Sequence, residues 1–244
     1  MHNLGHTRSA NRRDHIVLTP DTFVRTALPG MQAATAVVHI SPAAGAAFTQ
    51  YTAELEPGGT LGSTAAQRFV YVLSGGADLS NENSFRSLSA GGYAYVPAGL
   101  EQVVTANGPT RLAVIEKAYQ PLADVGSPGL LVGSENEVAS IALMGDVDLQ
   151  VRSLLPDRPE FDFAVNTMTY QPGATLSMVE IHVMEHGLLM LEGGGIYRLG
   201  DAWYPVTTGD FIWMAPYCPQ WFGALGKQPA KYLIYKDWNR HPLG

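Results

Sequence analysis

Two histidines and a carboxylate stand close together in the second half of the chain, where residues 180–186 read EIHVMEH. Residues two apart on a β-strand point to the same face, so Glu180 and His182 would project into one space. A short bend after His182 would bring His186 back on the next strand. Gln220 follows a later strand and could close the set from the facing side.

These four side chains offer the ligands of a divalent metal ion: Glu180, His182, His186 and Gln220. Nitrogen and oxygen donors without a thiolate suit Mn(II), Fe(II) or Zn(II), and affinity order alone does not choose among them. Structural zinc sites normally close with Cys and His, so a glutamine favours an open, catalytic site. The alternatives are a pair of structural polar histidines, or Glu185 as the acidic ligand. Its odd spacing from His182 would point Glu185 outward, which favours Glu180.

The elements that would position these residues are short strands. Apolar stretches are brief, rich in Val, Ile, Tyr and Phe, and bounded by Gly or Pro, whereas helical periodicity is scarce. Several such strands at regular spacing predict an antiparallel sandwich or barrel. The clearest stretches are Phe69–Leu73, Tyr93–Val96, Leu112–Ile115, Phe211–Met214 and Tyr232–Tyr235.

The chain also repeats itself. Three pairs of matching residues are separated by 118, 119 and 118 positions: Gly75 with Gly193, Pro97 with Pro216, and Gln102 with Gln220. Offsets this similar predict a duplicated β-domain. We expect a flexible N-terminal segment at 1–15, a first domain at 16–125 and a second, metal-binding domain at 126–244.

The first half lacks the metal-binding residue types. Its counterpart of the ligand segment, residues 62–66, reads GSTAA and contains no His, Asp or Glu. Gln67 and Gln102 remain, and two amides do not make a metal site. The first domain is therefore expected to be a scaffold without metal ligands.

Composition restricts the partners. The 244 residues carry a net charge of −7 and no basic stripe, which argues against nucleic acid or an anionic membrane surface as a partner. The single cysteine, Cys218, excludes an intrachain disulfide. Neither a signal-peptide apolar run nor a stretch of about 18 apolar residues is present. We expect a cytoplasmic protein that acts on a small molecule.

The ligand segment resembles the cupin signature, with departures. That signature has two histidines one residue apart, an acidic residue, a glycine, and a later Gly…Pro…His motif. Here Glu180 stands where the first histidine is expected and His186 where the glutamate is. Gln220 replaces the last histidine and follows Pro216 by four residues instead of five.

This permuted set resembles one family in particular, the bicupin (S)-ureidoglycine aminohydrolases, some of which were formerly called glyoxylate-induced proteins. The resemblance implies an all-β fold of two tandem cupin barrels, each a double-stranded β-helix or jelly roll. The likeness runs along most of the chain and includes residues 18–21 (LTPD), 28–30 (LPG), 69–75, 91–93 (GGY), Pro97, 186–187 (HG), 195–197 (GIY), 203–206 (WYPV), 209–210 (GD) and 236–240 (KDWNR).

The resemblance implies a manganese-dependent hydrolase of purine and allantoin catabolism, which releases ammonia from (S)-ureidoglycine and leaves (S)-ureidoglycolate. Tyr197, Tyr232 and Lys236 would face the substrate by the same matching. Lys236 could pair with the substrate carboxylate or protonate the departing ammonia, and Glu180 could take a proton from water. From the residues alone, the tyrosines could equally be core packing and Lys236 a surface lysine.

Two other functions compete with this one. Another metal-dependent cupin enzyme, such as an isomerase, lyase or dioxygenase on a small organic acid, would usually keep three histidines, so Glu180 and Gln220 argue against it. A non-catalytic cupin that binds a small molecule as a sensor would usually carry a DNA-binding segment, and none is visible. Cupin barrels often pack against copies of themselves, so we also expect a homo-oligomer.

Overall fold

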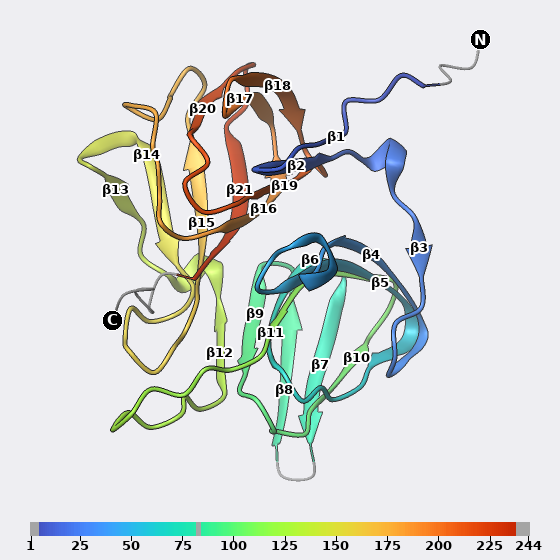
Figure 1. Cartoon of the computed structure of the whole chain (residues 1–244). Helices are drawn as coiled ribbons and strands as arrows, with labels where there is room; N and C mark the ends of the chain where they lie inside the picture. The colour runs from blue at the N-terminus through green and yellow to red at the C-terminus, as the bar shows by residue number, and fades with distance from the viewer. Residues whose placement is uncertain (1–4, 82–83, 238–244) are drawn as a thin grey trace. The chain divides into compact units, whose positions relative to one another are not determined.

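The protein is described by a computed structural model of residues 5–81 and 84–237 (Figure 1). The described residues form strands β1 to β21 and three short 3-10 helices, and no α-helix occurs among them. The fold is all-β and consists of two cupin barrels, as the sequence predicts. No helix in the described part of the chain is long and apolar enough to cross a membrane.

The strands belong to two compact units. The unit that we call the first barrel comprises Val24–Ala139 and Leu154–Asp162, and the second barrel comprises Met1–Phe23, Ser140–Ser153 and Phe163–Gly244.

The first barrel is a single antiparallel sheet with the strand order β12-β9-β6-β11-β5-β10-β7-β8, to which β4 adds by pairing with β5, and β3 by pairing with β4. Its elements are β3 (Arg25–Thr26), β4 (Met31–Ile40), η2 (Pro42–Ala44), β5 (Thr49–Leu61), β6 (Gln67–Ser74), β7 (Gly76–Asn81), β8 (Ser84–Ser89), β9 (Gly92–Val96), β10 (Val103–Ala106), β11 (Thr110–Lys117), β12 (Leu131–Ser134) and η3 (Glu135–Glu137). Apolar side chains of these strands fill the interior, with Val70, Val72, Leu112 and Val114 fully buried.

The second barrel has one sheet in the order β1-β2-β19-β16-β21-β15-β14-β13 and a smaller sheet in the order β18-β17-β20. Its elements are β1 (Ala10–Asn11), β2 (His15–Leu18), η1 (Pro20–Thr22), β13 (Ile141–Leu143), β14 (Asp146–Ser153), β15 (Ala164–Tyr170), β16 (His186–Glu192), β17 (Gly194–Leu199), β18 (Ala202–Thr207), β19 (Phe211–Met214), β20 (Gln220–Ala224) and β21 (Ala230–Lys236). The five apolar stretches singled out in the sequence all lie in strands of the two barrels.

Each barrel takes in a strand from outside its own half of the sequence. β2 pairs with β19, with Val17 opposite Ile212, and β12 pairs with β9, with Val132 opposite Ala94. The units therefore differ from the expected boundaries: residues 16–23 join the second barrel, and 126–139 and 154–162 join the first. The physical reason is that β19 and β9, both apolar, would otherwise leave a row of unpaired backbone groups at one side.

The expected flexible segment at 1–15 is partly tied to the second barrel. Residues 1–4 lie outside the described residues. β1 pairs with β2, and the Arg8 guanidinium makes two hydrogen bonds to the buried Asp210 carboxylate, with Nη2 2.9 Å from Oδ1. Paired strands and a charged anchor hold this stretch against the barrel.

Backbone geometry explains why the internal repeat has a glycine at the same place in each barrel. Gly75 and Gly193 both have positive φ, at 81° and 62°. A Cβ atom would lie 2.5 Å from the Pro109 carbonyl oxygen at Gly75, and 2.3 Å from the Pro229 carbonyl oxygen at Gly193. Only glycine fits such a close approach in this backbone region, so the same turn recurs in both barrels.

Candidate metal centre

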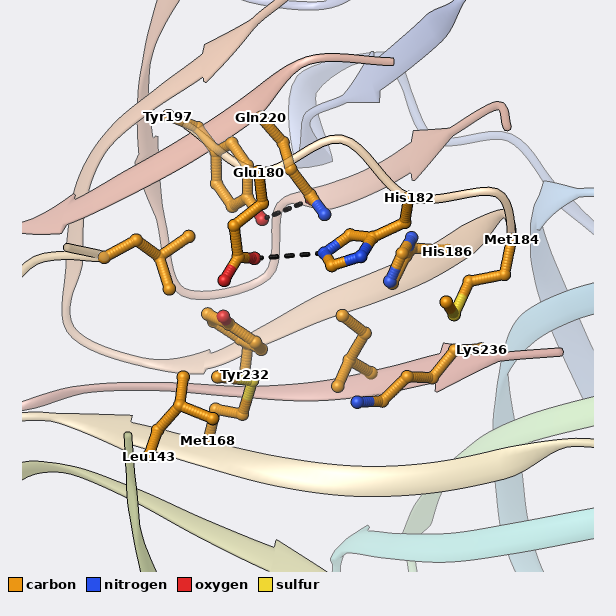
Figure 2. A pocket seen from close by; sticks show the side chains of 12 residues that line it. Leu143, Met168, Glu180, His182, Met184, His186, Tyr197, Gln220, Tyr232 and Lys236 are labelled. Atoms are coloured by element: carbon orange, nitrogen blue, oxygen red, sulfur yellow. Dashed lines mark hydrogen bonds and ion pairs between the residues drawn. The ribbon is translucent and has the colours of Figure 1, made fainter. Parts of the chain in front are cut away.

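The second barrel encloses a pocket of about 190 Å³. Every residue that the sequence singled out for metal or substrate lines it (Figure 2). Glu180 and His182 come from the loop between β15 and β16, His186 begins β16, and Tyr197 lies in β17. Gln220 begins β20, and Tyr232 and Lys236 come from β21. The remaining wall is mostly apolar: Leu143, Met168, Leu176, Met184 and Ile234.

Backbone pairing fixes Glu180 beside Gln220. The Glu180 amide donates to the Gln220 carbonyl at 2.8 Å, and the Gln220 amide donates back at 2.9 Å. The segment is an isolated bridge and not the regular strand that the sequence suggested, because the chain bends at Val183 and Met184. The alternation of sides still holds: Ile181 is 60% exposed, while its neighbours Glu180 and His182 line the pocket.

The carboxylate and the two imidazoles approach one another inside the pocket. Glu180 Oε2 lies 3.1 Å from His182 Nε2, and the ring centroids of His182 and His186 are 5.1 Å apart. Figure 2 shows both rings, the carboxylate and the Gln220 amide on one side of the cavity, with Tyr232 and Lys236 across from them.

The environment of His186 keeps its ring neutral. Its side chain is buried, and burial lowers the pKa of His186 well below its ordinary value, with electrostatic interactions with His182 and Lys236 acting in the same direction. A neutral imidazole presents a lone pair, which a metal ligand must have. His186 therefore has the protonation state that metal binding needs.

Three buried tyrosines surround the polar groups. The Tyr197 hydroxyl donates to Gln220 Oε1 at 3.3 Å, and the Tyr232 and Tyr170 hydroxyl oxygens lie 2.7 Å apart. Burial is the main cause that raises the pKa of each of the three phenols well above its ordinary value, so all three stay protonated at neutral pH. The sequence singled out Tyr197 and Tyr232 but missed Tyr170, which is not among the residues that line the pocket and contacts Tyr232.

Lys236 is held from two sides. Its backbone pairs with Ala164 on one neighbouring strand and with His186 on the other. With the Asn166 side chain oriented to satisfy both of its ends, the amide oxygen of Asn166 accepts a hydrogen bond from Lys236 Nζ at 3.3 Å. The amino group thus has a fixed position at the pocket wall.

Glu185, the competing acidic residue, turns away from the pocket. Its buried carboxylate accepts a hydrogen bond from Trp213 Nε1 at 2.9 Å, and it does not line the cavity. Glu180 supplies the carboxylate on the pocket wall.

The chemistry of the four donors suits a divalent ion. They provide one carboxylate, two imidazoles and an amide oxygen, and the neutral ring of His186 needs no proton removed before it can bind. The Tyr197 hydroxyl orients the amide oxygen of Gln220, which is the kind of outer hydrogen bond that supports metal ligands.

A second group of possible metal ligands lies elsewhere on the second barrel. One donor atom from each of Asp14, His15 and Cys218 falls within 4.8 Å of the others. Both ring nitrogens of His15 already have partners, Asp14 Oδ1 at 2.9 Å and the Tyr204 hydroxyl at 2.8 Å. Burial, followed by the charge of Asp14, raises the pKa of Cys218 to about 11, so the thiol is protonated at neutral pH. The sequence did not indicate this group, because its members meet only when β2 docks on β19.

Fold and site together define a two-barrel cupin protein. The model of the cupin domain matches residues 166–235, and the model of the EutQ-like cupin domain matches residues 42–119. A rice protein (Oryza sativa subsp. japonica) named "Probable (S)-ureidoglycine aminohydrolase" is 43% identical over 98% of this chain and 78% of its own length. The (S)-ureidoglycine aminohydrolase of Arabidopsis thaliana is 40% identical over 98% of this chain and 80% of its own.

A solved structure agrees with these relatives. The crystal structure of a Pseudomonas aeruginosa protein titled "Putative Glyoxylate Induced Protein" superimposes with a TM-score of 0.89 at 30% identity, covering 99% of this chain and 94% of that one. The chain belongs to the (S)-ureidoglycine aminohydrolase family.

Proposed function

We propose that this protein hydrolyses (S)-ureidoglycine to (S)-ureidoglycolate and ammonia with the help of one divalent metal ion, manganese, in the second barrel. The observation that carries the proposal is the single pocket that gathers Glu180, His182, His186 and Gln220 opposite Lys236. The names of the relatives supply the substrate. The resemblance of the ligand set to that family is the reason for choosing manganese, since the donor types alone suit several ions.

The metal would supply positive charge that stabilises the developing negative charge and makes bound water more acidic. The protein would supply orientation. The Lys236 ammonium, held by Asn166, pairs with the carboxylate of the substrate, and the protonated Tyr232 hydroxyl donates a hydrogen bond to it, while the Tyr197 hydroxyl donates to Gln220 Oε1 and can accept a hydrogen bond from the substrate. The apolar wall excludes bulk water around the reacting carbon and strengthens these contacts.

Two proton transfers complete the reaction. A water oxygen forms a bond to the substrate carbon while the carbon–amine bond breaks, and the Glu180 carboxylate accepts the proton that the water loses. The leaving amine takes up a proton and departs as ammonia. Lys236 is the cationic residue of the proposed substrate set and can supply this proton, and Glu180 can return the proton that it accepted.

Ammonia release tests the reaction directly. The protein is treated with a chelator, reloaded with Mn(II), and given freshly generated (S)-ureidoglycine, with rates compared to a blank without enzyme because the substrate decays on its own. We expect a metal-dependent rate well above the blank. Lys236→Met should lower kcat/KM by at least tenfold, while Lys227→Met, a change at an exposed lysine, should leave it unchanged.

A rate equal to the blank in protein that has bound one manganese per chain would contradict the proposal. Turnover of another small organic acid under those conditions would favour a different metal-dependent cupin enzyme, and binding without turnover would favour a non-catalytic cupin. We further propose that the reaction serves purine and allantoin catabolism in the cytoplasm, and that the protein is a homo-oligomer.

A further inference from the structure

The first barrel has an internal cavity of its own, of about 280 Å³, against about 190 Å³ for the pocket of the second barrel. Its polar lining comes from Tyr51 on β5, Arg68 on β6, Glu116 on β11, and Ser63 and Thr64 on the loop between β5 and β6. Leu61 and Met31 are among the apolar residues that line the rest. The proposed function makes no use of this space.

Strand register places the cavity where the second barrel has its metal ligands. Glu116 lies opposite Arg68 on neighbouring strands β11 and β6, as Lys236 lies opposite His186 on β21 and β16. On the other side Arg68 faces Val96 on β9, as His186 faces Met214 on β19. Arg68 and Glu116 thus occupy the positions that His186 and Lys236 hold in the second barrel.

The two charged groups neutralise each other. Glu116 Oε1 receives hydrogen bonds from Arg68 Nε at 2.7 Å and from the Tyr51 hydroxyl at 3.0 Å, and Arg68 Nη2 lies 2.7 Å from the same oxygen. Arg68 Nη1 donates to the Gly62 carbonyl at 2.7 Å. The side chains are only 9% and 21% exposed. A cation at this position excludes a metal ion, so the first barrel cannot repeat the chemistry of the second.

Some hydrogen-bonding capacity of the pair is left over. A guanidinium has five N–H groups, and two of those of Arg68 make hydrogen bonds, one to Glu116 Oε1 and one to the Gly62 carbonyl, while Nη2 lies beside Glu116 Oε1 as an ion pair. Among the described residues, Glu116 Oε2 has no hydrogen-bond partner within bonding distance. The wall of the cavity therefore offers N–H donors beside a carboxylate acceptor, in a site with no net charge.

We propose that this cavity binds a small uncharged molecule that carries a carboxamide or urea-type group. The carbonyl oxygen of such a group accepts from Arg68, and its N–H groups donate to Glu116 Oε2, so one planar ligand satisfies both. A carboxylate ligand would find the donors but would meet the negative charge of Glu116. The Ser63 and Thr64 hydroxyls, on the loop that corresponds to the metal-ligand loop of the second barrel, can contact the far end of the molecule.

Methionine methyl groups distinguish the two cavities. Met31 lines the cavity of the first barrel, and Met168 and Met184 line the pocket of the second. In protein labelled with ¹³C at the methionine methyl groups, we expect acetamide and N-methylurea, added at millimolar concentrations, to shift the Met31 signal in a saturable way. Acetate should shift it at least fivefold less. The result does not depend on the enzymatic activity of the second barrel.

Two variants make the test specific. The double variant Arg68→Met with Glu116→Met removes both charges and leaves neither uncompensated, so the barrel should still fold. It should lose the Met31 response, whereas Arg25→Met with Glu54→Met, an ion pair outside the cavity, should keep it. The single change Glu116→Gln leaves a positive site and should reverse the preference, so that acetate binds better than acetamide.

An unchanged Met31 response in the double variant would overturn the proposal. So would equal responses to acetate and acetamide in the unaltered protein, or amide-induced shifts confined to Met168 and Met184.

Discussion

Burial fixes the protonation of the groups around the proposed metal. The pocket keeps His186 as a neutral ring and the phenols of Tyr170, Tyr197 and Tyr232 as hydroxyls, because low-dielectric surroundings disfavour their charged forms. The ligand ring is then ready to bind, and the hydroxyls can act as hydrogen-bond donors. A residue that forms a hydrogen bond to a metal-binding side chain, without binding the metal itself, should therefore also affect metal affinity.

Tyr197 offers a test of this point. Tyr197→Phe removes the hydroxyl that donates to Gln220 Oε1 and leaves the packing of the ring. We expect Mn(II) affinity to fall about tenfold, in the range that outer hydrogen bonds to metal ligands contribute. Electron paramagnetic resonance titration of free Mn(II) measures the change. Tyr204→Phe removes a hydroxyl next to His15 instead, and an equal loss there would contradict the assignment.

The residue types of the proposed metal set could be inferred from the sequence because a strand alternates its faces. That rule separates Glu180 from Glu185 even though the loop is not a regular strand, since the two backbone hydrogen bonds to Gln220 hold Glu180 in extended form. The group formed by Asp14, His15 and Cys218 could not be inferred, because no local pattern places the N-terminal residues beside Cys218.

At the scale of the elements, a tight turn between β16 and β17 determines how β17 is directed toward the pocket. β17 and β20 carry Tyr197 and Gln220, and Gly193 makes the turn that leads from β16 into β17. At this turn the chain passes so near to Pro229 that only a hydrogen atom fits on the α-carbon. The turn thus sets the direction of β17 toward the pocket.

Replacing this glycine should destabilise the second barrel. Gly193→Ala forces a Cβ atom to within 2.3 Å of the Pro229 carbonyl oxygen, at a backbone φ of 62°. We expect the free energy of unfolding to fall by roughly 2–4 kcal/mol, measured by urea denaturation. Gly129→Ala, where a Cβ would meet nothing within 4 Å, should change it by less than about 0.5 kcal/mol. Equal effects of the two changes would show that the turn is not so constrained.

At this scale the sequence predicts the strands and the repeat but not the exchange of strands. Apolar runs bounded by glycine identify β6, β9, β11, β19 and β21 through local rules. β2 pairs with β19 and β12 pairs with β9, although the paired segments are far apart in the sequence. The apolar pattern of β2 or β12 alone does not specify which edge strand it pairs with.

At the scale of the whole molecule, a buried carboxylate attaches a distant segment of the chain to the first barrel. In the first barrel the fully buried Asp162 accepts from Lys117 Nζ and from the Gln120 amide, both at 2.9 Å, and also from Gln67. Asp162 ends the segment Leu154–Asp162, so these bonds attach that segment to the barrel. Removing it leaves a buried ammonium without its counter-charge.

We expect Asp162→Ala to lower the free energy of unfolding by about 3–5 kcal/mol. Calorimetry should show the transition of the first barrel at a lower temperature. Asp157→Ala, in the same segment and without a buried partner among the described residues, is the matched control. A change below about 1 kcal/mol for Asp162→Ala would contradict the assigned role.

Acid stability is a second property of the whole molecule. Burial, aided by Arg111, lowers the pKa of His39 to about 3, while the unfolded chain binds a proton at about pH 6.5. The unfolded state therefore binds more protons between these values, and stability is complete above about pH 6.5 and declines as the pH falls. Between pH 7.5 and 5.0 this residue should remove about 2 kcal/mol. His39→Gln should lose that part of the pH dependence in urea titrations, and an unchanged slope would contradict it.

The central claim is that the metal that supports the reaction is bound by Glu180 and its neighbours and not by the group around Cys218. The most direct measurement compares Glu180→Ala with Asp14→Ala, each loaded with Mn(II), by bound manganese per chain and by ammonia release from (S)-ureidoglycine. We predict that Glu180→Ala loses both the bound metal and the rate, and that Asp14→Ala keeps both. Full activity and metal content in Glu180→Ala, with loss of both in Asp14→Ala, would contradict the account.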